Sequence, residues 1–424
     1  MAHVPRDPRF DATYALWCDP YRYLSRRART LESDVFETRL ALQPTLCLSG
    51  AEGARLFYDA ARMSRREAAP AALQRTLFGE KGVQGLDGEA HRHRKRLFVS
   101  LMTHKRIDEL AQASMDEWRR AAWRWQRQPE SVDLYAAMQG SLARAVTRWA
   151  GVPLGDAEAD RLTRDLVSLF DDAGSLGPRH LRSRRARRRS ERWAGERIRA
   201  LRAEEADSRG HAAGRIDDAP AALRIALHRD VAGELLPASI AAVELLNVLR
   251  PTVAVSVYVV FIAHALAREP RWANALRSGS SLDADCFVRE VRRLYPFFPA
   301  AMARVREALE WKGFRLPAGR RVLLDLYGID HDPRLWSEPD AFRPERFLER
   351  SVGSFDFVPQ GGGSVEAGHR CPGEPIAVAL MKRAIDFLVH EIGYRVPDQD
   401  LSLDFGRLPA LPMSRMRIDR IRLH

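Results

Sequence analysis

The amino-acid sequence predicts a mainly α-helical protein with small β elements, folded as one domain over residues 1–424. Several long segments repeat apolar residues at a spacing of three and four, which is the period of an amphipathic helix. Stretches with strand character are short, and no internal repeat or low-complexity linker divides the chain. At 424 residues the chain is long enough to bury a large core.

The helical pattern is clearest in four places along the chain. Residues 54–63, 108–125 and 135–151 each carry one apolar face. The longest helix is expected from 236 to 266, where LPASIAAVELLNVL continues into a second apolar run. Pro251 interrupts this run and predicts a kink, because proline has no N–H and its ring clashes with the preceding turn.

Short strands are expected where apolar runs lie between turn signals. They are TLCLS at 45–49, the run 313–328 with LPAG as its internal turn, and RMRIDRIRL at 415–423. The most polar segment, 178–210, interleaves arginine with glutamate and keeps apolar side chains on one face. We interpret it as a solvated helix, followed by a surface loop at GRIDDAP, 214–220.

Charge and cysteine content limit the classes of partner. The net charge of +12 comes from 63 arginines and 5 lysines spread over the whole chain, so we expect no nucleic-acid partner. The stretch 251–267 contains His264 and is shorter than the roughly 20 residues that span a bilayer, so no membrane span is expected.

Four scattered cysteines give no disulfide framework or zinc site. The first residues, MAHVPRDPRF, lack a signal-peptide layout, which favours a cytoplasmic location.

The segment FDFVPQGGGSVEAGHRCPGEPIAVALMKRAIDFLV, 355–389, carries the strongest chemical signal. Its glycines let the backbone approach a flat cofactor closely. Cys371 comes just before an amphipathic helix, where free N–H groups and the helix dipole stabilise a thiolate. Such a thiolate is the ligand a haem iron needs for O–O bond cleavage. A lone cysteine is more often a small buried hydrophobe, so the assignment depends on the surrounding pattern.

This segment resembles the haem-binding loop of the cytochrome P450 superfamily through Gly-His-Arg-Cys-Pro-Gly at 368–373. The resemblance implies haem b as cofactor, with Cys371 as axial ligand to the iron and His369 at a haem propionate. It also implies the cytochrome P450 fold, with the haem between the long kinked helix and the Cys loop. The chain departs from the family pattern by a longer loop, GGGSVEAG.

Two upstream motifs extend the resemblance. Glu290 and Arg293 match the family's Glu-x-x-Arg, and Arg346 in FRPERF matches its meander arginine. Residues at i and i+3 share one helix face, so the glutamate and the first arginine can hold the second arginine in a buried ion network.

Arg250 stands in the most apolar part of the longest helix. Its guanidinium stays charged, and burying it unpaired costs roughly several kcal/mol, so it needs an anionic partner. Superfamily members that take electrons from a reductase carry an acid–alcohol pair in this helix to deliver protons. Here the sequence is Leu-Arg-Pro-Thr at 249–252, and an arginine cannot donate that proton. The partner is either a ligand or an internal carboxylate such as Glu244.

A narrower group, the hydrogen-peroxide-dependent fatty-acid peroxygenases, resembles the chain closely. Its members share the Arg-Pro, the extended glycine-rich Cys loop, and YPFFP at 295–299 after Glu-x-x-Arg. The resemblance implies a long-chain fatty acid and hydrogen peroxide as partners, with no redox partner. A carboxylate paired with Arg250 would act as general acid–base, and Pro251 would free the carbonyl of Asn247 and open space over the iron. The expected products are α- or β-hydroxy acids, with minor decarboxylation to a terminal alkene.

The resemblance places a second active-site segment at 76–98. Gln84 lies over the haem, at a position that holds Gln or His in this group. Because Gln has no titratable proton, hydroxylation is the expected main outcome. Phe78 is expected to line the pocket. His91, Lys95 and Arg65 are predicted to reach the haem propionates, and the alternative for them is an ordinary basic helix face.

Other functions stay open on the sequence alone. One is a reductase-dependent cytochrome P450 monooxygenase acting on another carboxylate-bearing substrate. Another is a non-catalytic haem-thiolate sensor. A helical protein that binds nucleic acid through its arginines would require the Cys-loop resemblance to be chance, and such a protein would be colourless.

Overall fold

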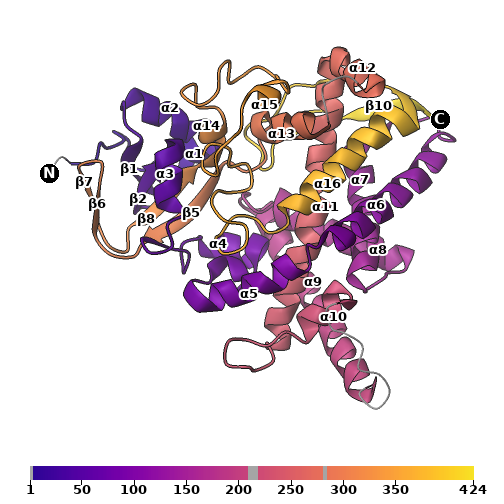
Figure 1. Ribbon diagram of the computed structural model, residues 1–424, viewed down its shortest axis with the longest axis horizontal. Coiled ribbons are helices and arrows are strands. Elements are labelled where there is room, and N and C mark those ends of the chain that lie inside the picture. The colour runs from indigo at the N-terminus through magenta and orange to yellow at the C-terminus, as the bar shows by residue number, and fades with distance from the viewer. Residues whose placement is uncertain (1–2, 209–217, 280–283) are drawn as a thin grey trace.

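The computed structural model describes residues 3–208, 218–279 and 284–424, and much of this part of the chain is helical (Figure 1). The described residues also include the π-helical turns η1 (Gln74–Phe78) and η4 (Phe387–Glu391) and the 3-10 turn η2 (Val83–Gly85). The α-helices are α1 (Thr13–Cys18), α2 (Tyr23–Thr30), α3 (Gly50–Phe57), α4 (Ala71–Leu73), α5 (Gly88–Ser100), α6 (His104–Trp125), α7 (Leu134–Ala150), α8 (Asp156–Asp171), α9 (Pro178–Ser208), α10 (Ala221–Ala226), α11 (Ala238–Arg268), α12 (Pro270–Ser278), α13 (Ala284–Leu294), α14 (Leu326–Asp330), α15 (Arg346–Glu349) and α16 (Glu374–Asp386).

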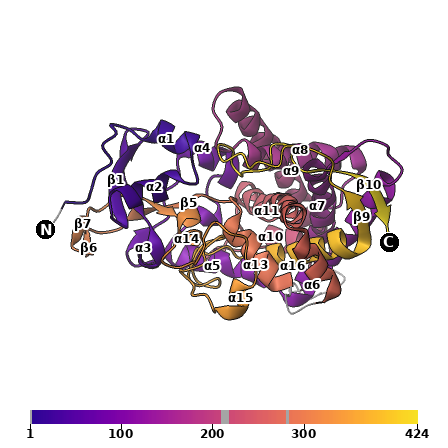
Figure 2. The ribbon, with the colours of Figure 1, turned by 90° about the horizontal axis from the view of Figure 1, so that it is seen from above.

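The strands of the described residues form three sheets, and a few isolated β-bridges lie outside them. A five-stranded sheet has the order β1 (Val35–Leu40), β2 (Gln43–Leu48), β8 (Arg321–Asp325), β5 (Ala300–Val305) and β3 (Met63–Ser64). A three-stranded sheet has the order β4 (Val132–Asp133), β10 (Arg417–Leu423) and β9 (Ile392–Arg395). The third is the hairpin of β6 (Leu309–Trp311) and β7 (Phe314–Leu316). The two larger sheets lie at opposite ends of the molecule, with α11 between them (Figures 1 and 2).

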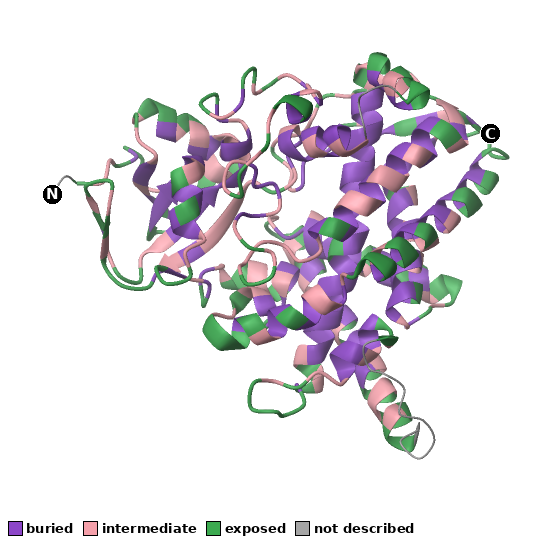
Figure 3. Cartoon of the chain, in the orientation of Figure 1, coloured by how far each residue is buried: buried purple, intermediate pink, exposed green. Residues whose placement is uncertain are grey.

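Helix α11 is the centre of the helical core. It packs against α7, α9 and α16, and it is buried along nearly its whole length (Figure 3). Each fully buried Val, Leu, Ile or Phe contributes about 1.5–3 kcal/mol, which explains why its sequence is apolar on every side. By length and composition this helix could cross a membrane, but 94% of its most apolar window is buried inside the protein. Burial of this kind is typical of a core helix.

The expected helices at 108–125, 135–151 and 236–266 are present as α6, α7 and α11. The last of these runs on through Pro251, and its kink stays a prediction. The polar segment forms α9, while residues 209–217, including most of GRIDDAP, lie outside the described residues.

The helix expected at 54–63 is wrong in its second half, because α3 ends at Phe57. The N–H groups of Arg62 and Met63 donate to the carbonyl of Asp59 at 3.1 and 2.9 Å, which closes a turn. Met63 then pairs with Val305 in the five-stranded sheet. Strand pairing with a distant segment therefore overrides the local helical pattern.

The strands expected at 45–49 and 415–423 are present as β2 and β10. The run 313–328 divides differently from a simple hairpin. Its two halves, β7 and β8, belong to different sheets, and the run ends in the short helix α14. The side chain of Asp325 starts that helix by accepting the N–H of Gly328 at 2.8 Å.

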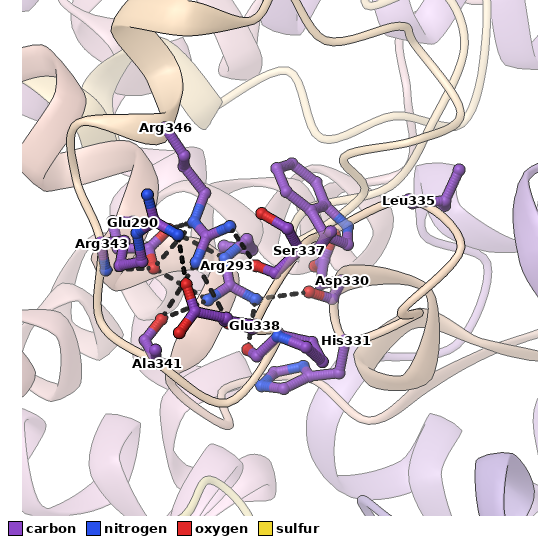
Figure 4. Close-up of polar contacts among 12 residues, drawn as sticks. Glu290, Arg293, Asp330, His331, Leu335, Ser337, Glu338, Ala341, Arg343 and Arg346 are labelled. Atoms are coloured by element: carbon purple, nitrogen blue, oxygen red, sulfur yellow. Dashed lines mark hydrogen bonds and ion pairs between the residues drawn. The ribbon is translucent and has the colours of Figure 1, made fainter.

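A buried ion network around Glu290 joins α13 to the segment 330–346 (Figure 4). Arg293 donates to both carboxylate oxygens of Glu290 at 2.8 Å and to the carbonyls of Asp330 and Pro339, each at 2.8 Å. Arg346 lies 3.2 Å from the same carboxylate. Because both arginines have an ionic and a carbonyl partner, and Glu290 also accepts the N–H of Arg343, the network stabilises the loops that precede the Cys loop.

Arg293→Ala should lower the free energy of unfolding by about 3–5 kcal/mol, because it leaves the fully buried Glu290 carboxylate without its main partner. Chemical denaturation followed by circular dichroism measures this loss. Arg343→Ala is the matched control, since Arg343 makes a partly exposed pair with Glu338, worth less than about 1 kcal/mol. Equal losses in the two variants would contradict a structural role for the network.

Candidate active site

The Cys loop is a tight turn that delivers Cys371 to the start of α16. Gly361 and Gly363 adopt φ angles of +97° and +79°, which only glycine takes without strain. The N–H of Cys371 donates to the carbonyl of Gln360 at 3.0 Å. The glycine run therefore folds the loop back on itself and fixes the backbone of the cysteine.

Side chains from two other helices hold this loop. Lys95 of α5 donates through Nζ to the carbonyl of Gly368 at 2.9 Å and to that of Arg370. Glu374, the first residue of α16, binds the guanidinium of Arg370 at 2.7 and 2.9 Å and that of Arg292 from α13. These contacts fix the position of Cys371 relative to both helices.

The thiol of Cys371 lies in a mixed electrostatic environment. Burial raises its pKa, while a hydrogen bond from the N–H of Gly373 and the charges of Lys95 and Arg292 act in the opposite direction. Such a thiol loses its proton when its sulfur binds a metal ion.

Arg250 of α11 is 6% exposed and lies near enough to Cys371 for the two groups to interact electrostatically. Its Nη1 atom has no hydrogen-bond partner, and no carboxylate of the described residues pairs with it. Burial, together with the charge of Arg187, lowers the pKa of Arg250 to about 9. The guanidinium therefore lies in a place that stabilises an incoming anion.

The alternative partner for Arg250, Glu244, is engaged elsewhere. Its carboxylate accepts from Arg94 Nη1 at 2.8 Å and from Asn247 Nδ2 at 2.9 Å. Both residues of this ion pair are buried. Internal pairing of Arg250 with Glu244 is therefore excluded.

The surface of α11 beside Arg250 is open. Pro251 is exposed, although Arg250 and Thr252 on either side of it are buried. Thr252 donates its hydroxyl to the carbonyl of Val248, one turn back, at 2.9 Å. The wall thus presents a proline ring and an unpaired guanidinium, with no free hydroxyl from Thr252.

The segment 76–85 lies against α11 beside Arg250. Gln84 accepts a hydrogen bond from Asn247 of α11 at 3.2 Å, which places it beside the Arg250 wall. Arg94 donates to the carbonyl of Lys81 at 3.3 Å, and so holds this segment against the same helix. Phe78, at the end of η1, is half-buried and packs on the main core.

A cluster of basic side chains forms the edge of the site. The rings of His91 and His369 stack with centroids 3.9 Å apart, and His369 Nε2 lies 3.8 Å from Asp87. Burial lowers the pKa of both histidines, that of His91 to about 3, so both are neutral at pH 7. Arg65 donates through Nη2 to the carbonyl of Phe57 at 3.2 Å, while its buried Nη1 has no partner.

The structure thus brings together four side chains: Arg65, His91, Lys95 and His369. They differ in whether they have a hydrogen-bond donor free to bind a haem propionate. The ammonium of Lys95 is occupied by loop carbonyls, whereas Arg65 keeps a free donor. Propionate binding stays a prediction for all of them, and Arg65 fits it best.

The residues present fit a haem. The described residues hold no group of three or more His, Cys, Asp or Glu side chains that could bind a bare metal ion. A single cysteine sulfur therefore suits a metal that brings its other ligands with it. Pro251 is exposed next to the buried Arg250, and the free donor of Arg65 suits a carboxylate-bearing macrocycle.

Sequence reasoning missed several residues that shape the site. Arg94 and Asn247 position Gln84, and Asp87 anchors His369 while accepting the N–H of Arg65 at 2.9 Å. The available signal was the charge of Glu244 within an apolar helix, which demanded a buried partner. The identity of that partner, Arg94, could not be read from spacing, because it lies 150 residues away.

Comparisons with known proteins agree with this geometry. The family model described as "Cytochrome P450" matches residues 284–404. Among curated relatives, the trimethyltridecatetraene synthase of Zea mays is 36% identical over 155 residues, and the (+)-menthofuran synthase of Mentha piperita is 36% identical over 127 residues. These alignments cover 32% and 29% of this chain, and 27% and 25% of the two relatives. The chain thus matches about a quarter of the length of these curated relatives.

Solved structures match over the whole length. Cytochrome P450SP alpha (CYP152B1) in complex with (R)-ibuprophen is 49% identical with a TM-score of 0.92, over 97% of this chain and 99% of its own. Cytochrome P450EX alpha (CYP152N1) with myristic acid is 40% identical with a TM-score of 0.94, over all of both chains. A point variant of cytochrome P450 OleT in complex with arachidonic acid is 31% identical with a TM-score of 0.92, over 100% of this chain and 99% of its own.

Cys371→Ala should abolish the absorption spectrum typical of a thiolate-ligated ferrous haem carbonyl, because it removes the sulfur that the loop positions. Absorbance spectroscopy of the purified variant measures this. Cys286→Ala serves as control and should keep the spectrum of the wild type. A thiolate-type spectrum in Cys371→Ala would contradict the assignment.

Proposed function

This chain is a cytochrome P450 of the CYP152 group, and from that premise we propose that it is a haem-thiolate fatty-acid peroxygenase. It uses hydrogen peroxide to hydroxylate a long-chain fatty acid at the α or β carbon, and water is the second product. Haem b is the cofactor, with Cys371 as its axial ligand. The chain acts as one haem-thiolate domain in the cytoplasm, and it needs no redox partner.

The observation that carries this proposal is the buried, unpaired guanidinium of Arg250. Its planar fork binds a carboxylate through two parallel hydrogen bonds, which a lysine cannot reproduce. A fatty acid supplies that carboxylate on an apolar chain, and it removes the cost of an uncompensated buried charge.

The bound carboxylate also supplies what the chain lacks. When bound, the thiolate-ligated haem supplies the oxygen-transfer chemistry that moves one oxygen atom from peroxide to a C–H bond. Arg250 fixes the carboxylate beside that point, where a carboxylate oxygen can take and return a proton. The exposed ring of Pro251 leaves room there for the α and β carbons.

Proton delivery by the protein is disfavoured at this position. Arg250 occupies the place of the usual acid, and the hydroxyl of Thr252 is bonded to the backbone. This arrangement argues against the reductase-dependent monooxygenase, which needs its own acid–alcohol pair, and against a sensor, which needs no substrate carboxylate.

Gln84 and Phe78 complete the substrate pocket in this proposal. Gln84 is held by Asn247 and carries no titratable proton, so hydroxylation is the main outcome and decarboxylation the minor one. His369, His91, Lys95 and Arg65 form the propionate edge.

Hydrogen peroxide alone should support turnover of a saturated long-chain acid. The product is measured by gas chromatography of the hydroxy acids, without NADPH or a reductase. Turnover that requires NADPH and a reductase, and that hydrogen peroxide does not support, would favour the monooxygenase instead.

Arg250→Ala should keep the haem but lower turnover by ~100-fold or more, because the acid–base group loses its position. Arg250→Lys should restore little, since a point charge does not hold the carboxylate in one orientation. Steady-state hydroxylation rates measure both effects, and the haem spectrum reports that the fold is intact.

Styrene separates anchoring from acid–base catalysis, because it has no carboxylate. The wild type should oxidise styrene slowly, and a short carboxylic acid such as heptanoic acid should accelerate the reaction by occupying the site beside Arg250. Acceleration should be absent in Arg250→Ala. If heptanoic acid has no effect on the wild type, the carboxylate is only an anchor.

A further inference from the structure

A second buried arginine faces the same region as Arg250. Arg187 of α9 is 2% exposed, within a helix whose other arginines mostly point into solvent. Its Nε donates to Glu191 at 2.7 Å and its Nη1 to the carbonyl of Leu77 at 3.4 Å. Its Nη2 is buried and has no hydrogen-bond partner. This guanidinium therefore reaches from α9 to the segment that carries Phe78.

Gly79 makes room for this guanidinium. A Cβ atom at position 79 would lie 1.9 Å from Arg187 Nη2 and 2.7 Å from a methyl carbon of Val243. The backbone there has φ of +84° and ψ of 151°, a conformation that is restricted almost entirely to glycine. The absence of a side chain thus lets Arg187 lie directly against α11 at the level of Val243.

Val243 and Arg250 are seven residues apart on α11, which is two turns along the same face, or about 10 Å. Arg187 therefore lies on the Arg250 side of the helix, and its charge contributes to lowering the pKa of Arg250. Among the described residues, Glu191 is the carboxylate that pairs with Arg187. The side chain of Glu191 is 36% exposed, while that of Arg187 is 3% exposed, so solvent screens the anion more than the cation.

We propose that Arg187 is a second cation of the substrate carboxylate site, a specificity determinant whose charge, balanced by Glu191, sets how tightly the enzyme holds an acid. This inference rests on the proposed function. Among the described residues, Arg187 pairs with the partly exposed Glu191 and Arg250 pairs with no carboxylate, so the site without substrate keeps an excess positive charge. Arg250 binds the carboxylate directly, and Arg187 raises its affinity through space, across the gap that Gly79 leaves.

The test is binding of two ligands of equal chain length to the holoenzyme by isothermal titration calorimetry. Myristic acid carries the carboxylate, and 1-tetradecanol lacks the charge. Arg187→Gln should weaken the acid on the order of 10-fold, because it removes one charge that attracts the carboxylate at an effective dielectric of ~20, and it should leave the alcohol unchanged. Glu191→Gln should act in the opposite direction and tighten the acid, because it removes the anion that competes for Arg187.

Two further variants control for packing. Arg187→Lys keeps the charge and should retain most of the affinity for the acid. Arg188→Gln, at the exposed neighbouring position, should change neither ligand. If Arg187→Gln fails to fold, the opposite shift of Glu191→Gln still decides the question.

An equal loss for acid and alcohol in Arg187→Gln, or no gain for the acid in Glu191→Gln, would overturn the role of Arg187. The failure of the proposed function looks different. In that case the wild type itself would bind myristic acid no more tightly than 1-tetradecanol and would not turn it over with hydrogen peroxide.

Discussion

The structure depends on one charge that the protein buries without neutralising it. Arg250 lies inside the most apolar helix of the chain, and the carboxylate nearest to it in sequence is bound to another arginine. An uncompensated buried charge costs several kcal/mol, roughly, and only a large and well-packed core tolerates it. Helix α11 provides that core through its contacts with α7, α9 and α16. The stability of the fold thus maintains a site whose positive charge is neutralised only when an anionic ligand binds.

Two sets of fixed contacts keep the walls of the site in register. The thiolate wall, which is the Cys loop around Cys371, is held by Lys95, Arg292 and the backbone of Gln360. The substrate wall, which is the face of α11 that carries Arg250, is held by the pair of Arg94 and Glu244. The groups that hold the Cys loop and the face of α11 in place are mostly charged side chains or backbone groups with defined partners, whereas Arg250 itself is left unpaired. Such contacts fix direction more strictly than apolar packing does.

Much of this arrangement could be predicted from the sequence. The amphipathic period located α6, α7 and α11, and the glycine-rich run located the Cys loop. The network of Glu290, Arg293 and Arg346 was also predicted. The pairing of Glu244 could not be predicted, because Arg94 lies 150 residues away and only the fold brings the two together. Local pattern also misled at 58–63, where a long-range strand pair decides the conformation. The role of Arg187 could not be predicted for a different reason. Helix α9 is rich in arginine, and only burial in the structure distinguishes Arg187 from the exposed arginines around it.

Helix α5 connects the two walls through consecutive residues. Arg94 reaches the substrate wall through Glu244, and Lys95 reaches the loop that carries Cys371. Because a helix rises only about 1.5 Å per residue, the two attachments cannot move independently. For anyone building chimeras between related enzymes, a crossover inside 88–100 would separate a substrate pocket from the thiolate geometry that matches it. Exchanged segments would therefore have to carry this helix as an intact unit.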